Sequence, residues 1–276
     1  MSDLIPRHLT WLRAAGRSER TVHDRRRLLE HADARLPYGI DDADAEEWAA
    51  YLASRRWSAW TRHTYYTHAI KYYDWGVAAG YYRHNPVADL PRPAEGDRIP
   101  KPATDDELAL ALRDLPHQPW RMAVQLAAFA GLRCCEIVSI RREDCTAEWL
   151  TVRGKGGRRA TVAMAPQLWE VIEPRSGGLL VLGARGRPLT PQMLTQMQGP
   201  VWRRIGLPEM TLHRFRHWFA TSLLRQGADI RTVQELMRHR TLQSTQGYTA
   251  VVDRQRRAAV ARLPRPVLAA GGTSQL

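Results

Sequence analysis

The sequence lacks several features that mark familiar classes of protein. Its 276 residues include three cysteines, too few for a disulfide framework and suited to a reducing compartment. The most apolar stretch, 122–132, has 11 residues, whereas crossing a bilayer takes ~20. No basic segment followed by an apolar run marks a signal peptide. These absences predict a cytoplasmic protein with no membrane partner.

Common catalytic motifs are also missing. Lys155 is followed by Gly156 instead of Ser or Thr, and the upstream glycine of a P-loop is absent. The chain contains no G-x-G-x-x-G and no G-x-S-x-G sequence. The adjacent Cys134 and Cys135 lack the second Cys/His pair of a structural zinc site. We therefore expect no cofactor and no metal.

What the sequence does have is positive charge. Basic residues number 41 and acidic residues 28, which gives a net charge of +13 and a pI near 10.4. Residues 99–276 carry +12 of this excess and residues 1–98 carry +1. All but three of the basic residues are arginines. A GC-rich genome favours arginine codons and would explain part of this preference for arginine over lysine, but not the net charge. The net charge predicts a polyanionic partner, most often a nucleic acid.

Residues 1–90 have the pattern of a helical bundle. Helices are expected over 19–35, 41–55 and 58–79, the last ending before Asn85-Pro86. The expected apolar faces are Val22, Leu28, Leu29 and Ala32 in the first helix, Trp48, Tyr51 and Leu52 in the second, and Tyr66, Ile70, Tyr73 and Val77 in the third. Eight of the nine tyrosines lie in 38–82, which indicates core or DNA-facing packing.

A proline-rich segment over 91–102 separates this bundle from the rest of the chain. Thr104 and Glu107 form a capping-box pattern, and 122–130 is apolar enough for a buried helix that ends at Gly131. The segment 149–164 predicts a β-hairpin whose turn is GKGG. Further helices are expected over 191–205, 211–226, 229–237 and around 241–249. We thus predict a mainly α fold with a small β-hairpin, divided into a first helical domain (1–90), a linker (91–102), a second domain (103–263) and a flexible tail (264–276).

Six residues of the basic part could act together on a phosphate. They are Arg133, Lys155, His213, Arg216, His239 and Tyr248. His213 and Arg216 are three residues apart and so share a helix face. Each residue alone has an ordinary explanation, such as a surface charge, a helix cap or a packed aromatic ring. Their order and spacing along the chain are what indicate a common site.

The motifs around these residues are AGLRCCEI (130–137), RGKGGRR (153–159), LHRFRHWFAT (212–221), LMRH (236–239) and STQGYTA (244–250). In content and order they resemble the tyrosine recombinase (phage integrase) family. Glu136 matches an acidic position that supports the site in that family. The N-terminal bundle (1–90) is similar to the family's core-binding domain, which binds DNA, and the resemblance implies that 103–263 is the catalytic domain. We expect the short form without an arm-binding domain before the bundle.

The resemblance implies a chemistry for each residue. Tyr248 would attack a DNA phosphodiester and form a 3′-phosphotyrosine with a free 5′-hydroxyl. Arg133 and Arg216 would bind the non-bridging oxygens. His213 would act as acid or base, Lys155 would protonate the leaving oxygen, and His239 would hydrogen-bond the phosphate. Religation would need neither ATP nor metal.

The resemblance also implies partners and a task. A homotetramer would exchange strands between double-stranded DNA core sites through a Holliday junction, with an accessory directionality factor, at the nucleoid of a bacterial host. Integration or excision of a phage or mobile element is the expected task, and Xer-type resolution of chromosome or plasmid dimers is the alternative. A non-catalytic regulator resembling a helix-turn-helix protein, a type IB topoisomerase and a metal-dependent carboxylate integrase remain open as other classes.

The sequence departs from the family pattern at three points. Arg238 stands where glycine usually precedes the second histidine, and we expect it to alter the helix end or to add a phosphate contact. Ala250 stands where a histidine often follows Tyr-Thr. His217 lies one turn after His213, so either ring could face the phosphate, although the motif register favours His213.

Overall fold

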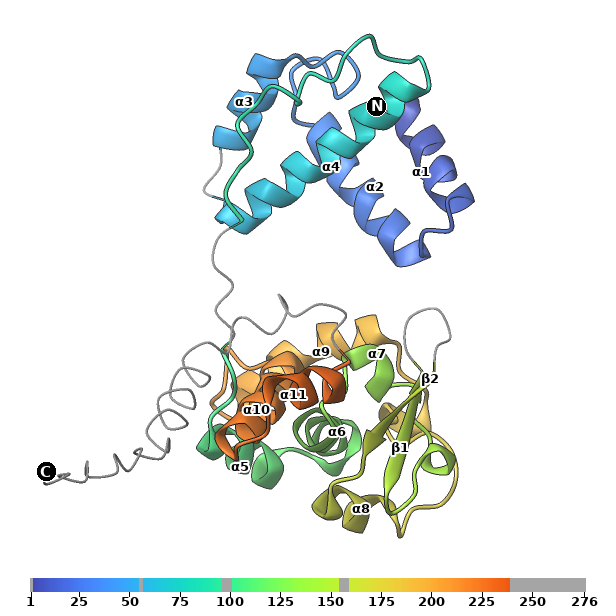
Figure 1. Ribbon diagram of the computed structural model, residues 1–276, viewed down its shortest axis with the longest axis vertical. Helices are drawn as coiled ribbons and strands as arrows, with labels where there is room; N and C mark the ends of the chain where they lie inside the picture. The colour runs from blue at the N-terminus through green and yellow to red at the C-terminus, as the bar shows by residue number, and fades with distance from the viewer. Residues whose placement is uncertain (1, 55–56, 96–100, 154–158, 239–276) are drawn as a thin grey trace, which may run out of the picture. The chain divides into compact units, whose positions relative to one another are not determined.

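The computed structural model describes residues 2–54, 57–95, 101–153 and 159–238 of the chain. The chain divides into two compact units, an N-terminal unit of residues 1–98 and a C-terminal unit of residues 99–276 (Figure 1). The predicted fold class is confirmed, because the described residues are mostly helical and include one small sheet of two strands. None of the helices in the described ranges is long and apolar enough to cross a membrane.

The described part of the N-terminal unit is built from helices α1 (Leu4–Ala14), α2 (Glu19–Asp33), α3 (Ala45–Ala53) and α4 (Ala59–Ala78). The last three begin at capping side chains. Ser18 and Ser58 accept from the first turns of α2 and α4, and Asp44 forms a capping box with Glu47 on α3. The helices expected over 19–35, 41–55 and 58–79 are thus confirmed, although α3 begins later than expected. Helix α1, which the sequence pattern did not reveal, precedes them.

The buried face of α4 differs from the expected one. The side chains buried along this helix include Tyr65, Ala69, Tyr72 and Tyr73. Tyr66 and Ile70 are only half-buried, and Val77 is 38% exposed. The predicted buried face is therefore displaced by one residue from the observed one along most of the helix. The reason is that α4 packs against α1, α2 and α3 together, so neighbours on several sides decide which positions are covered.

Tyrosines supply much of the hydrogen bonding inside the N-terminal unit. Trp48 donates its indole N–H to the Tyr73 hydroxyl at 2.8 Å. Oδ1 of Asp41 accepts from the hydroxyls of Tyr72 and Tyr82 at 2.8 and 2.6 Å. Buried Tyr and Trp need such partners for their polar atoms. These tyrosines therefore serve packing, as the sequence indicated.

The C-terminal unit surrounds one apolar helix, α6 (Met122–Ala130), which Figure 1 shows end-on near the middle of the unit. It packs against η1, α5, α7, α8 and α10. The other elements are α5 (Asp105–Asp114), η1 (His117–Arg121), α7 (Cys134–Ile137), η2 (Arg142–Asp144), α8 (Pro166–Ile172), η4 (Ala184–Gly186), α9 (Pro191–Arg204), α10 (Leu212–Arg225) and α11 (Ile230–Leu236). The Thr104–Glu107 capping box at α5 and the burial of α6 are as predicted.

The predicted hairpin is confirmed in its two strands. Strands β1 (Trp149–Arg153) and β2 (Arg159–Ala163) pair antiparallel, with Trp149 opposite Ala163 and Arg153 opposite Arg159. The turn that joins them, and with it Lys155, lies outside the described residues. The helix expected around 241–249 and the tail 264–276 also lie outside them.

Candidate active site

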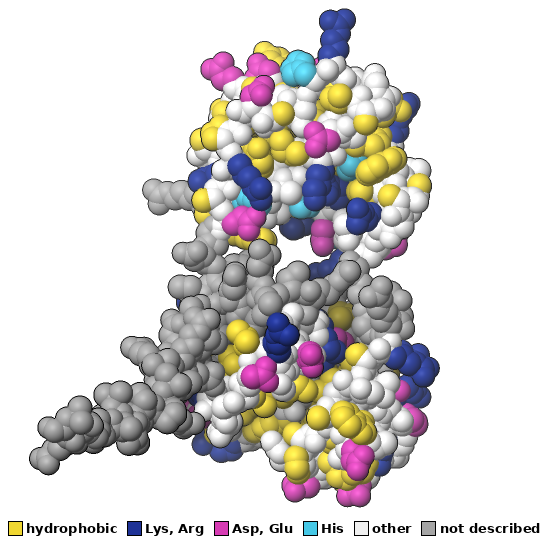
Figure 2. Space-filling model, viewed as in Figure 1, with side chains coloured by type: hydrophobic (Ala, Val, Ile, Leu, Met, Phe, Trp, Pro, Cys, Tyr) yellow, Lys and Arg dark blue, Asp and Glu magenta, His cyan; other side chains and the backbone are white. Residues whose placement is uncertain are grey.

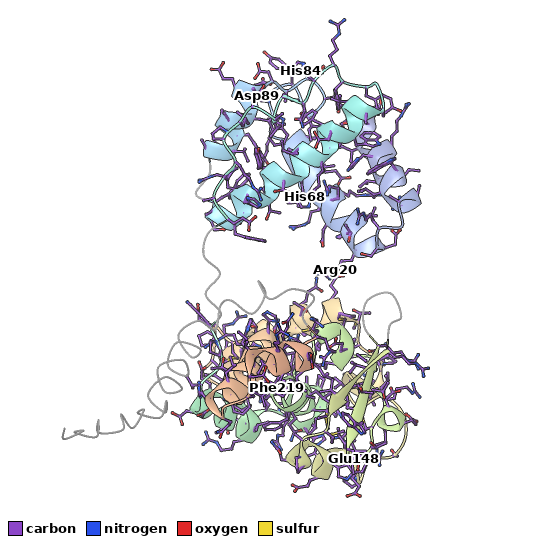
Figure 3. The ribbon with its side chains drawn as sticks, in the orientation of Figure 1. Arg20, His68, His84, Asp89, Glu148 and Phe219 are labelled. Carbon is purple, nitrogen blue, oxygen red and sulfur yellow. The ribbon has the colours of Figure 1, made fainter. Side chains whose placement is uncertain are left out.

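The turn after α6 begins the candidate site. Gly131 ends α6 in the left-handed region with a φ of 58°. A Cβ at this position would lie 2.6 Å from Cδ1 of Phe219, a residue of α10 labelled in Figure 3. Both the backbone angle and the close packing of α6 on α10 therefore require glycine. Because this turn is tight, Arg133 lies at the start of α7 and close to the end of α6.

Glu136 ties Arg133 to the first turn of α7. The main-chain N–H of Arg133 donates to Oε2 of Glu136 at 2.8 Å, and Nη1 of its side chain donates to Oε1 at 3.1 Å. The carboxylate thus satisfies a free donor at the helix start while it holds the guanidinium. The acidic supporting position that the sequence indicated lies in contact with Arg133.

Three arginine side chains surround this buried carboxylate. Glu136 is 2% exposed, and its oxygens lie 3.1 Å from Arg133, 2.7 Å from Arg238 and 4.0 Å from Arg216. Burial by itself would raise the pKa of Glu136, but the charges of Arg238 and Arg133 and the hydrogen bond from the Arg133 main chain outweigh it. The pKa of Glu136 therefore lies below its usual value, and one negative charge faces three positive ones.

Arg216 reaches this cluster from α10. Its side chain is 1% exposed and donates to the main-chain oxygens of Gly131 and Met237. Arg133 approaches the same turn from the other side, with Nη2 3.0 Å from the carbonyl oxygen of Arg238. The structure thus brings together the end of α6, the start of α7, α10 and the end of α11. Arg216, from a distant part of the sequence, meets the neighbouring pair Arg133 and Glu136.

His213 and His217 lie one turn apart on α10, with ring centroids 4.4 Å apart in a T-shaped arrangement. The His213 side chain is exposed and that of His217 is half-buried. Exposure therefore favours His213 as the ring that a large substrate can reach, in agreement with the motif register.

Arg238 is the residue whose role the sequence did not reveal. It adopts a φ of 53°, a left-handed conformation that glycine adopts easily. Its side chain is 12% exposed and turns inward to Glu136. The expected phosphate contact is therefore not what this conformation provides. The absence of glycine marked the position, but the direction of the side chain depends on Glu136, which is 102 residues away in the sequence.

Comparison with known proteins identifies the family. Residues 108–255, more than half of the chain, match the phage integrase family. The chain belongs to this family of tyrosine recombinases. As a member, it is a site-specific recombinase. This assignment favours the recombinase hypothesis over a topoisomerase, a carboxylate integrase or a non-catalytic regulator.

Two relatives of this phage integrase family member are tyrosine recombinases XerC. The protein of Rhodospirillum centenum is 32% identical, over 78% of this chain and 71% of its own length. The protein of Mycobacterium sp. (strain JLS) is also 32% identical, over 88% of this chain and 92% of its own length. Among solved structures, a lambda integrase tetramer bound to a Holliday junction is similar in fold, with a TM-score of 0.69 at 18% identity over 86% of this chain and 76% of the other.

Three of the six residues expected in the recombinase site lie outside the described residues. They are Lys155, His239 and Tyr248. The described residues bring Arg133 and Arg216 together with Glu136, and they place His213 on the same helix as Arg216. Among the described residues, no group of three or more His, Cys, Asp or Glu side chains could hold a metal ion.

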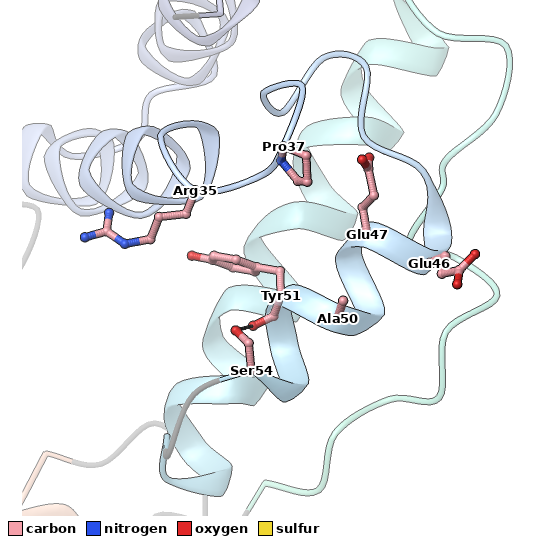
Figure 4. Close-up of a pocket in the computed structure, with 7 residues that line it drawn as sticks. All are labelled: Arg35, Pro37, Glu46, Glu47, Ala50, Tyr51 and Ser54. Carbon is pink, nitrogen blue, oxygen red and sulfur yellow. Dashed lines mark hydrogen bonds between the residues drawn. The ribbon is translucent and has the colours of Figure 1, made fainter.

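The N-terminal unit of the recombinase contains a separate hollow of about 470 Å³ beside α3 (Figure 4). It is lined by Arg35, Pro37, Glu46, Glu47, Ala50, Tyr51 and Ser54. Two of these side chains are acidic, and none belongs to the six predicted site residues. The hydroxyl of Tyr51 is 2.9 Å from Nδ1 of His31. This hollow therefore does not suit a DNA phosphate.

Proposed function

We propose that this recombinase cleaves and rejoins DNA through a 3′-phosphotyrosine intermediate, with Tyr248 as the nucleophile. The observation that carries the proposal is the convergence of Arg133 and Arg216 beside Glu136 and the carbonyl oxygen of Met237. Two guanidinium groups held at one place suit the two non-bridging oxygens of a phosphodiester. They also stabilise the negative charge that grows on those oxygens as the nucleophile attacks.

The proposed step forms one bond and breaks one bond at phosphorus. The Tyr248 hydroxyl oxygen bonds to phosphorus, its proton passes to His213, and the bond from phosphorus to the 5′ oxygen breaks. A free tyrosine has a pKa near 10, so it needs such a base at neutral pH. Lys155 gives a proton to the departing 5′ oxygen, and His239 hydrogen-bonds the phosphate. The phosphotyrosine conserves the energy of the diester, so religation runs the same step in reverse.

Double-stranded DNA core sites are the proposed partner of both units. Lys, Arg and His side chains lie on the face of the N-terminal unit seen in Figure 2, with acidic side chains among them. His68 lies on this face (Figure 3), where burial first and then the charge of Arg25 lower its pKa to about 4, so that its ring is uncharged at neutral pH. The Lys and Arg side chains of this face are the groups that would attract phosphates. We propose that four copies of the chain act together on two core sites.

For the biological task we propose integration or excision of a phage or mobile element. Resolution of chromosome or plasmid dimers is the second candidate, and the names of the XerC relatives favour it. The location of the core site separates the two candidates. A site that flanks the recombinase's own gene supports a mobile element. A single chromosomal site elsewhere, together with dimeric chromosomes when the gene is deleted, supports dimer resolution.

Covalent trapping tests the proposed reaction. The protein is mixed, in EDTA, with nicked duplex fragments tiled across the DNA that flanks its gene and across the rest of the host chromosome. On cleavage beside a nick the short 5′-hydroxyl fragment diffuses away, so the adduct accumulates and runs slowly on a denaturing gel. We expect an adduct on one fragment with the wild-type protein and none with Tyr248→Phe.

Tyr81→Phe is the matched control, because Tyr81 is a 42%-exposed tyrosine of the N-terminal unit with no proposed role in cleavage. It should form the adduct like the wild type. Specific binding without an adduct on any fragment would contradict the proposal and support the non-catalytic regulator. DNA cleavage or strand joining that leaves no covalent adduct and requires Mg²⁺ would support the carboxylate integrase. Relaxation of supercoiled DNA without strand exchange between two sites would support the topoisomerase.

A further inference from the structure

Arg238 occupies a backbone conformation that its side chain does not favour. Among the described residues, Arg185 and Arg238 are the two non-glycine residues with positive φ, at 56° and 53°. An L-residue in this region is strained because its Cβ crowds the carbonyl oxygen, whereas glycine is not. Arg185 lies exposed in the surface turn η4. Arg238 is 12% exposed, so the contacts of its side chain must offset the strain.

Those contacts join the end of α11 to the turn between α6 and α7. Nη2 of Arg238 donates to Oε2 of Glu136 at 2.7 Å and to the carbonyl oxygen of Gly131 at 3.0 Å. Nη1 donates to the carbonyl oxygen of Leu236 at 2.9 Å. A guanidinium can make all three hydrogen bonds at once because its donors point in different directions within one plane. Lysine, with one nitrogen, cannot reproduce this geometry.

The main chain of the same residue holds Arg133. Nη2 of Arg133 donates to the carbonyl oxygen of Arg238 at 3.0 Å and approaches that of Met237 at 3.4 Å. Glu136 binds Arg133 from the other side. Arg238 therefore acts on Arg133 twice, through its own carbonyl oxygen and through the carboxylate that both arginines share.

The charges explain why this arrangement leaves Arg133 available to an anion. Without Arg238, the negative charge of Glu136 would be shared by Arg133 and Arg216 alone. Arg238 takes the shortest of the three contacts with that carboxylate, 2.7 Å against 3.1 and 4.0 Å. Arg133 is also the most exposed of the three arginines, at 38%. The cluster thus stays positive at the side chain that a phosphate can reach.

We propose that Arg238 is a positioning residue for phosphodiester cleavage. It engages Glu136 and fixes the turn at 237–238, so that Arg133 is held for the phosphate. This inference rests on the proposed function, since it concerns the residues proposed to bind the phosphate. Arg238 itself does not contact the DNA in this role.

The test compares Arg238→Gly with Arg238→Lys and Arg185→Gly on the nicked duplex that traps the wild-type protein. Glycine accepts the positive φ, so the first variant removes the side chain without straining the turn. Arg185→Gly makes the same change at an exposed turn with no side-chain hydrogen bond among the described residues. For each variant we measure the Kd for DNA and the rate of adduct formation at saturating protein.

We expect Arg238→Gly to bind DNA with nearly the wild-type Kd and to form the adduct about 100-fold more slowly, the loss typical of a misplaced catalytic group. Arg238→Lys should recover part of the rate, because it keeps the charge. Arg185→Gly should match the wild type in both measurements. A general loss of folded protein would lower both the DNA affinity and the rate of adduct formation, so it would not produce a loss of rate at unchanged affinity. The melting temperature of each variant checks directly whether the protein is folded.

Two outcomes overturn the inference. In the first, the wild-type protein forms the adduct and Arg238→Gly forms it at the same or a higher rate. This result overturns the inference and leaves the proposed function intact. A slow rate that falls in proportion to DNA affinity or to the folded fraction, with no recovery in Arg238→Lys, shows a structural role and overturns it as well. Absence of any adduct with the wild-type protein overturns the proposed function itself.

Discussion

Glu136→Gln is the change that most directly probes the arginine cluster. Glutamine keeps the size of the side chain and one acceptor oxygen, but it removes the negative charge that faces Arg133, Arg216 and Arg238. Breaking a buried ion pair by removing one partner costs about 3–5 kcal/mol, because it leaves a buried charge without compensation. Since Arg133 is 38% exposed and can turn to solvent, we expect the lower end, a loss of about 3 kcal/mol.

This loss should be local to the C-terminal unit. Hydrogen exchange of peptides that cover α6 and α7 reports on it without interference from the N-terminal unit. A destabilisation of about 3 kcal/mol corresponds to roughly 100-fold faster exchange of the slowest amides in these peptides. Amides of α2 and α4 should be unaffected.

Glu143→Gln is the matched control. Its carboxylate is 56% exposed and pairs with Arg141 at 3.4 Å, and exposed pairs of this kind contribute about 0–1 kcal/mol. Equal, small effects of the two substitutions would refute the reasoning, because the buried charges would then not depend on Glu136 for compensation.

The same carboxylate gives a pH dependence. The pKa of Glu136 is lower in the folded chain than its ordinary value, because the neighbouring arginines outweigh burial. Its stabilising contribution is therefore present above the ordinary carboxyl pKa and is lost as the pH falls through the folded-state pKa. Glu136→Gln should remove that part of the acid destabilisation of the C-terminal unit.

Three further predictions concern other parts of the chain. His8 is fully buried, and burial, reinforced by the charges of Arg25 and His68, lowers its pKa to about 4. Unfolding therefore takes up a proton at His8 between about pH 6.5 and 4, so His8 alone should lower the unfolding free energy of the N-terminal unit by up to about 3 kcal/mol as the pH falls through that range. His68, whose pKa is lowered to the same value, should add to the fall. Urea titrations at several pH values check this prediction. A His8→Phe variant whose unfolding free energy depends on pH as steeply as that of the wild type would contradict it. Gly131→Ala adds a Cβ 2.6 Å from Phe219 at a φ of 58°. It should lower the unfolding free energy by more than about 2 kcal/mol, because overpacking and the strain of a left-handed backbone add together. An unchanged melting temperature would argue against the packing described for α6 and α10. DNA affinity should fall with salt, with a log–log slope of about −5 to −9 if each subunit contacts ~6–10 phosphates, and a flat response in a filter-binding titration would contradict the DNA contacts proposed for both units.

Local sequence signals were sufficient for most elements of the fold. Ser18, Ser58 and Thr104 each cap the helix expected after them, because a cap needs only a side-chain oxygen and the N–H groups two or three residues later. Gly131 ends α6 for an equally local reason. The buried face of α4 was the failure, since the surroundings of a helix packed by three others are not encoded in its own period.

In the candidate site, too, some features could be predicted from the sequence and others could not. The order and spacing of the motifs predicted that Arg133, Glu136, Arg216 and His213 belong to one site, because a family resemblance depends on sequence alone. The structure shows that Arg133, Glu136 and Arg216 lie close together. The resemblance also marked residue 238 as unusual. The sequence could not reveal that Arg238 turns inward, because its partners Gly131 and Glu136 are 107 and 102 residues away along the chain.

By itself, then, the sequence determined the helical class of this protein, several of its helix ends, its excess of positive charge and its place among the tyrosine recombinases. These properties arise from residue types and from contacts a few positions apart. Only the tertiary structure decided which face of α4 is buried and how Arg133, Arg216 and Arg238 share the Glu136 carboxylate. Such a contact needs segments about 100 residues apart to meet, and their meeting depends on the packing of the whole unit around α6.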